Sequence, residues 1–302
     1  MNAHNPVSTG PAVDLSSKAM LAAVRIKQWS GRKLDRQVTD EVNRQHGAAA
    51  DAGRYNKALI SRDALAEILT IAGRARKEHY ARTLPWHDDG NRILSAAGYL
   101  DYANVMRGLR GEFEAAVAGF AAGYADFVDE ARIRLNGMFR AEDYPAPDDI
   151  AARFGFEHVL QPLPAAGDFR VTVSDADAAK IRADIEARTN AAVEAAVRDV
   201  FQRIGETVGH MAEKLAEYKP AEDGNRATGI FRDSLVENVR DLAELLPSLN
   251  VTESPELARI AERMKAELCG HDAAELRDNE SARQDVAAKA AAIAEHVSTF
   301  MA

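Results

Sequence analysis

Apolar residues recur at steps of three and four over most of the chain, and runs of β-branched residues are scarce. This spacing lines apolar side chains along one face of a helix, so the pattern predicts a mainly α-helical protein. It extends furthest over residues 97–139 and 175–218. A helix over 97–139 would span about 64 Å. Two arms of nearly equal length predict a long antiparallel coiled-coil hairpin.

The start of the second arm carries a helix cap. Ser174 precedes the helix and Asp177 follows three positions later, a spacing typical of a capping box. Four glycines fall inside the first arm, and each costs up to about 1 kcal/mol relative to alanine. They are Gly108, Gly111, Gly119 and Gly123. Close approach of the second arm would offset that cost.

Between the arms the apolar period changes to two. Phe169, Val171 and Val173 alternate with polar residues, as a half-buried strand requires. Together with Phe156 and Leu160, they predict a small β-hairpin over about 154–173 at the tip of the arms. This tip would either contact a partner or simply close the helical hairpin.

The segment before the arms predicts a helical head over residues 21–95. Ser30 is placed to cap a helix that starts near Leu34, and Trp29 and Leu34 have the spacing of a hydrophobic staple. A further helix is expected over 61–79, because Pro85 restricts the residue before it to extended conformations and so ends the helix.

Four regions follow from this pattern. Residues 1–20 are expected to be a disordered lead, because they lack the features of a signal peptide. The head covers 21–95, the arms 96–219, and a C-terminal helical segment 220–302. The apolar pattern of that last segment predicts one helix that ends at Pro247 and two more helices over 254–268 and 280–301.

The composition restricts the cellular compartment and the classes of site that fit the protein. With Cys269 as the single cysteine, an internal disulfide is excluded and a reducing cytosol fits best. No apolar run of about 18 residues occurs, so no membrane span is predicted. Phosphate-binding loops and nucleophile elbows are absent from the sequence, and no cofactor is predicted.

Charge divides the chain more sharply than its total of −9 suggests. Residues 1–95 carry 15 basic and 10 acidic residues, whereas 96–302 carry 23 and 37. The basic head could therefore meet nucleic acid or the acidic body of another copy, although solvated helix faces produce the same excess. The candidate contact residues for nucleic acid or a partner are Arg25, Lys27, Trp29, Arg32, Lys33, Arg36, Arg74 and Lys77.

The stretch HYARTLPWHDDG, residues 79–90, is the best candidate for catalysis. The adjacent His87 and Asp88 are the dyad of metal-dependent phosphohydrolases, which need a further histidine and a further aspartate. His79 or His46 and Asp101 or Asp126 could supply these ligands. However, the dyad falls in an expected turn, where Asp89 suits turn and capping chemistry, so a structural role is favoured.

Several segments resemble a family of uncharacterised phage, prophage and mobile-element proteins of about 300 residues. The similarity covers roughly residues 20–250 and is carried by WSGRKLDRQVTDEV, GRYNKALI, HYARTLPW, RIRLNGMF and FRDSLVENVRDLAELLPSLN. The resemblance implies a protein of the bacterial host cytosol, sometimes encoded beside a cobaltochelatase-like AAA+ ATPase. It assigns no catalytic residues, which favours a role without catalysis.

These observations lead to one preferred function and two alternatives. The preferred function is a non-enzymatic assembly or interaction protein that self-associates through its long helices, since such helices leave apolar surface uncovered. The first alternative is nucleic-acid binding through the basic head. The second is a metal-dependent phosphohydrolase that uses His87 and Asp88.

Overall fold

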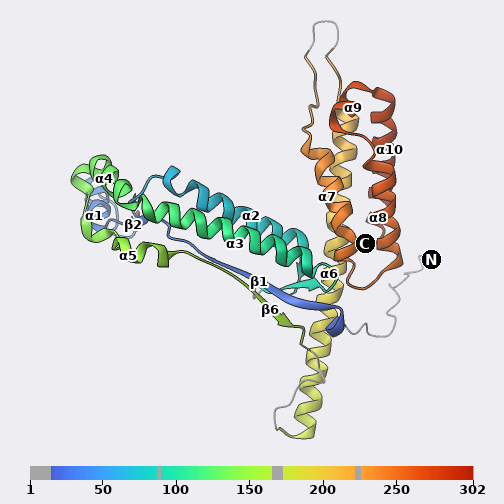
Figure 1. Cartoon of the computed structure of the whole chain (residues 1–302), viewed down its shortest axis with the longest axis horizontal. Coiled ribbons are helices and arrows are strands. Elements are labelled where there is room, and N and C mark those ends of the chain that lie inside the picture. Colours follow the sequence, from blue (N-terminus) through green and yellow to red (C-terminus); the bar gives the residue numbers. More distant parts are fainter. Residues whose placement is uncertain (1–14, 87–89, 165–172, 222–225, 302) are drawn as a thin grey trace. The chain divides into compact units, whose positions relative to one another are not determined.

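The computed structural model describes residues 15–86, 90–164, 173–221 and 226–301 (Figure 1). Most of these residues are helical, which confirms the predicted mainly α class. A four-stranded and a two-stranded sheet make up the β structure of the described residues. Among the described helices, none combines the length and the apolar character that a membrane crossing requires.

The chain packs into two compact units, each assembled from separate segments. Unit 1 comprises residues 1–23, 80–102 and 160–302, and unit 2 comprises 24–79 and 103–159. The regions expected from the sequence follow chain order, whereas the units do not. The chain therefore passes from one unit to the other four times.

Unit 1 is a bundle built around the long helix α6. Its helices are α6 (Asp175–Glu217), α7 (Ser234–Leu249), α8 (Pro255–Leu268), α9 (Ala273–Asp278) and α10 (Glu280–Ser298). Helix α6 packs against α10 and α7, and α7 packs against α8 (Figure 1). Their apolar faces form one core, in which Ile204, Val239, Ile260 and Ile293 are buried.

The predicted second arm is confirmed as α6. Its first turn is capped as expected, because Ser174 Oγ accepts a hydrogen bond of 3.2 Å from the Asp177 backbone N–H. The antiparallel pairing of this arm with residues 97–139 is not confirmed, since α6 buries its apolar face against α10 and α7. The predicted C-terminal helices are present, although α7 continues through Pro247 to Leu249.

Unit 2 combines helices with the two-stranded sheet. Its longer elements are β2 (Arg32–Leu34), α1 (Arg36–Gln45), β3 (Asn56–Ala58), most of α2 (Ala66–Arg82), most of α3 (Tyr99–Ala122) and α4 (Tyr124–Leu135). The chain's short helices are η1 (Leu15–Ser17), η2 (Asp63–Leu65), η3 (Asn136–Met138), η4 (Ala141–Asp143), α5 (Pro147–Ile150) and η5 (Ala151–Arg153). Strands β2 and β3 are antiparallel and place Lys33 opposite Lys57.

The prediction of one unbroken helix over 97–139 is wrong. Helix α3 ends at Ala122 and α4 begins at Tyr124, with Gly123 between them at φ −88° and ψ 2°. Glycine is a poor helix former, and a Cβ at Gly123 would lie 3.3 Å from the ring of Phe127. The break thus falls where the ring of Phe127 packs over a residue that has no side chain.

The predicted helix start at Ser30 is also wrong. Residues 32–34 form β2, and helix α1 starts after Asp35, whose side chain accepts from the Val38 N–H. Ser30 Oγ instead accepts from the Arg32 N–H at 3.3 Å. Aspartate is as good a cap as serine, so two adjacent capping signals competed and the pairing of β2 with β3 decided between them.

Four strands form the larger sheet in the order β4-β5-β1-β6. They are β1 (Ala19–Lys27), β4 (Leu84–Pro85), β5 (Arg92–Ser95) and β6 (Gly155–Pro162). The first strand of the predicted β-hairpin is confirmed as β6, but it lies beside β1. The expected second strand falls largely on 165–172, outside the described residues.

Candidate functional site

The eight residues predicted to contact nucleic acid or a partner all belong to unit 2. Three of their charged groups already have partners. Lys27 Nζ donates to the Ala152 carbonyl at 2.8 Å, Lys33 pairs with Asp143 at 2.7 Å, and Arg74 pairs with Glu112 at 2.6 Å. Among the described residues, four cations of this set are exposed and form no ion pair. These are Arg25, Arg32, Arg36 and Lys77.

The aromatic member of the set, Trp29, is packed within unit 2. Its ring centroid lies 6.4 Å from that of Phe120 and 6.1 Å from that of Tyr124, the latter in an edge-on arrangement. Such geometries are typical of aromatic core contacts. Trp29 therefore has a structural role, as predicted, and the rings of Phe120 and Tyr124 pack against it.

Unit 2 contains a buried charge cluster that the sequence pattern does not indicate. Lys57 is only 2% exposed, and its ammonium lies 2.9 Å from Asp35 Oδ2 and 2.6 Å from Asp143 Oδ2. The same Nζ donates to the Met138 carbonyl at 2.9 Å. Three donors of one ammonium thus meet three acceptors, which is the full capacity of a lysine. The ammonium of Lys57 therefore links β3 to the start of α1 and to η4.

Each charged member of this cluster has a shifted pKa. The hydrogen bond from Lys57 lowers the pKa of Asp35 below its ordinary value. Burial acts to raise the pKa of Asp143, but its hydrogen bonds to Lys33 and Lys57 outweigh burial and lower that pKa. Burial also acts to lower the pKa of Lys57, yet its bonds to Asp143 and Asp35 hold that pKa above normal. All three groups are therefore stabilised in their charged forms.

The residues proposed for metal chemistry are only partly described. His87 and Asp88 lie outside the described residues. His79 is buried on α2, whereas Asp101, Asp126 and His46 are exposed. Within the described ranges, no group of three or more metal-ligating side chains comes together. The phosphohydrolase hypothesis stays a prediction.

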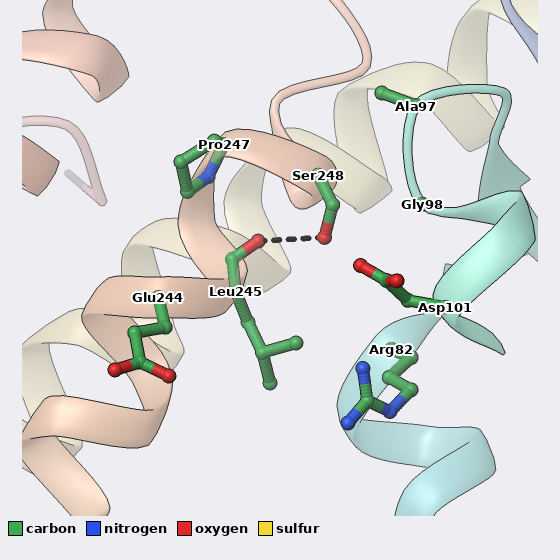
Figure 2. A pocket seen from close by; sticks show the side chains of 8 residues that line it. All are labelled: Arg82, Ala97, Gly98, Asp101, Glu244, Leu245, Pro247 and Ser248. Carbon is green, nitrogen blue, oxygen red and sulfur yellow. Dashed lines mark hydrogen bonds between the residues drawn. The ribbon is translucent and has the colours of Figure 1, made fainter. Parts of the chain in front are cut away.

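A pocket of about 260 Å³ lies in unit 1, between α7 and the adjacent ends of α2 and α3 (Figure 2). Its lining residues are Arg82, Ala97, Gly98, Asp101, Glu244, Leu245, Pro247 and Ser248. Figure 2 shows Arg82 and Asp101 on the α2 and α3 side and Leu245 on the α7 side. The pocket therefore combines a cation, two carboxylates and an apolar wall.

Local chemistry explains the shape of this pocket. At the start of α3, the Gly98 N–H donates to Ser95 Oγ at 3.0 Å, and a Cβ at Gly98 would lie 3.2 Å from Ser248 Cβ. On α7, Ser248 Oγ donates to the Leu245 carbonyl at 2.8 Å. Glycine thus permits close approach of the two elements on one side, and the pocket opens beside that contact.

The first residues of α3, which contributes Asp101 to the pocket, include two exposed apolar side chains. Leu100 is 70% exposed and Tyr99 37% exposed, and both adjoin lining residues in sequence. Large apolar residues with so much contact with water are common only as isolated cases on a surface. Here two are adjacent in sequence, between the lining residues Gly98 and Asp101.

The charges of the two units differ strongly. Unit 1 contains 20 basic and 30 acidic residues, a net charge of −10, whereas unit 2 contains 18 and 17, a net charge of +1. The basic excess of the head is thus largely balanced inside unit 2 by acidic residues from 103–159. The acidic character of the body, by contrast, is concentrated in unit 1.

No family model, curated protein or solved structure matches the chain. The similarity to phage and mobile-element proteins therefore stays a resemblance carried by the segments quoted above.

Proposed function

We propose that the protein is a non-enzymatic assembly or interaction protein of the phage or mobile-element type, which acts inside the bacterial cell and whose copies associate with one another. The observation that carries this proposal is the unequal charge of the two units, −10 against +1. The exposed cations of unit 2 can attract the acidic unit 1 of another copy, and such attraction sets orientation and speeds encounter.

Surface chemistry supports contact through both units. Unit 1 offers the exposed Leu100 and Tyr99, and it contains a pocket lined by Asp101 and Glu244. Unit 2 offers exposed cations that form no ion pair with any described residue. Apolar surface supplies affinity and opposite charge supplies selectivity, so the two features together suit a specific protein contact. The family resemblance also makes a cobaltochelatase-like AAA+ ATPase a candidate partner.

The experiment is sedimentation velocity of the purified full chain over a concentration series, at low and high salt. We expect species larger than the monomer at low salt that dissociate as salt is raised, because screening weakens exposed charge pairs. A monomer at every concentration and salt level contradicts the proposal. Association that salt does not weaken would instead indicate apolar pairing of the long helices, as the sequence pattern predicts.

Nucleic-acid binding is the second candidate, favoured by the four unpaired cations of unit 2. It predicts material that absorbs strongly at 260 nm and loses mass on nuclease treatment. Its affinity should fall steeply with salt as counterions are released. Arg32→Glu with Arg36→Glu should then abolish retention, and unchanged retention would exclude this candidate.

A further inference from the structure

The pocket of unit 1 is lined by two carboxylates, Asp101 and Glu244, and by one cation, Arg82. Asp101 and Glu244 are exposed and form no ion pair with a described residue. Leu245 forms an apolar wall of the same pocket, and Leu100, whose side chain is 70% exposed, precedes Asp101 in the sequence of α3. A ligand that matches this site carries a cation next to an apolar group.

Helix α2 presents that combination in unit 2. Leu69 is 41% exposed, and Gly73 and Lys77 follow it at steps of four on the same face. A Cβ at Gly73 would have no neighbour within 4 Å, so the helix backbone is open to close approach there. Lys77 is exposed and lacks an ion pair with any described residue. Leu69 and Lys77 are about 12 Å apart along the helix axis.

We propose that the pocket of one copy receives helix α2 of a second copy, with the Lys77 ammonium beside Asp101 and Glu244 and with Leu69 packed against Leu100. This assignment rests on the proposed self-association and names its two surfaces. The charges are complementary, and each surface adds one large exposed apolar side chain, which together favour a second copy over an unrelated partner.

The contact joins two different surfaces, so it is heterologous. Each copy retains one free pocket and one free α2 face after a single contact forms. Association therefore continues beyond a dimer, to a ring if the rotation closes and to a filament if it does not. This property separates the proposal from a symmetric dimer.

The test uses two complementary variants of the full chain. The pocket variant is Asp101→Lys with Glu244→Lys, and the helix variant is Leu69→Glu with Lys77→Glu. Each alone should weaken self-association at least about tenfold, because like charges then face each other. Mixed together, they should associate again, since the intact pocket of the helix variant receives the intact α2 face of the pocket variant, and the two reversed surfaces carry opposite charges.

Matched controls change the same numbers of charges elsewhere. Glu213→Lys with Glu295→Lys alters two exposed acidic residues of α6 and α10, and Arg54→Glu with Tyr55→Glu alters an exposed cation and an exposed aromatic of unit 2. Both controls should associate as the natural chain does. Circular dichroism and thermal unfolding establish that every variant is folded.

The outcomes separate this inference from the proposed function. If the natural chain associates and both variants associate equally well, the assigned surfaces are wrong while self-association stands. If each variant is weakened but the mixture does not associate, the two surfaces do not face each other and the inference fails. If the natural chain is monomeric throughout, both proposals fail.

Discussion

At the scale of single residues, the Lys57 cluster shows how unit 2 tolerates buried charge. A buried ammonium is costly unless every donor is satisfied and opposite charge is close. Lys57 meets both conditions through Asp35, Asp143 and the Met138 carbonyl. Lys33 adds a second cation to Asp143, at 2.7 Å from Oδ1. The cluster therefore contains two cations and two anions and carries no net charge.

The shifted pKa values of this cluster give stability a defined pH dependence. The pKa values of Asp35 and Asp143 are lowered on folding, so their contribution is present above the ordinary carboxyl value of 3.8 and is lost as pH falls through the folded values. The pKa of Lys57 is raised, so its contribution is present below 10.5 and is lost as pH rises through the folded value.

We therefore expect the natural chain to lose stability, relative to an Asp35→Asn, Lys57→Met, Asp143→Asn variant, below about pH 4 and above about pH 10.5. Between these limits the difference in unfolding free energy should be constant. Urea unfolding of both proteins from pH 3 to pH 11 measures it. A difference that stays flat over the whole range would show that these groups are not coupled to folding.

At the scale of elements, the C-terminal end of α6 depends on one glycine. Lys219 and Thr228 exchange two backbone hydrogen bonds of 3.0 and 3.1 Å just after the helix, and Gly229 follows with φ +63°. A Cβ at Gly229 would lie 2.4 Å from the Glu217 carbonyl oxygen. Both the positive φ and the contact with backbone exclude a side chain here.

Gly229→Ala should lower the free energy of unfolding by about 2 kcal/mol or more, since strain and overpacking each cost about 1–3 kcal/mol. Gly108→Ala is the matched control, because Gly108 lies inside α3 and a Cβ there has no neighbour within 4 Å. It should raise stability by about 0.5–1 kcal/mol. Urea unfolding measures both changes, and a neutral Gly229→Ala would show that the chain after α6 relaxes freely.

Elements with a strong local signal could be predicted from the sequence, whereas elements whose limits depend on tertiary contacts could not. The start of α6 at Asp175 was predictable because a capping serine precedes a sustained apolar period. The end of α3 at Ala122 could not be predicted, because Gly123 favours a helix break whereas the regularly spaced aromatic residues favour a continuous helix. Strand β1 was missed, since its order in the sheet depends on partners distant in sequence.

The candidate sites were predictable only in part, for a similar reason. The basic residues of the head are visible as composition, but their neutralisation by Asp143 and Glu112 depends on the fold. A lysine such as Lys57 has no sequence signal for burial, because its three partners lie 22, 81 and 86 positions away. The pocket combines residues from α2, α3 and α7, so no local pattern could reveal it.

At the scale of the whole molecule, the interleaving of the two units in sequence bears on how the protein unfolds. Unit 2 is inserted into unit 1 as two segments, 24–79 and 103–159, and helices α2 and α3 each contribute residues to both units. Neither unit can therefore be expressed as one continuous segment. Their separate cores nevertheless allow each to open with its own free energy.

Lys57→Met tests that independence. Removing the cation leaves Asp35 and Asp143 buried and deprives them of their shared partner, which typically costs about 3–5 kcal/mol. If the units open separately, hydrogen exchange monitored by mass spectrometry should show faster exchange in peptides from 24–79 and 103–159. Peptides from α6, α7 and α10 should keep their protection, since these helices belong to unit 1.

Arg54→Met is the control for this measurement, because Arg54 is an exposed cation of the same unit that forms no ion pair with a described residue. It should leave exchange unchanged in both units. Equal acceleration of exchange in unit 1 and unit 2 peptides of Lys57→Met would contradict separate opening. The destabilisation of unit 2 would then also have lowered the opening free energy of the bundle around α6.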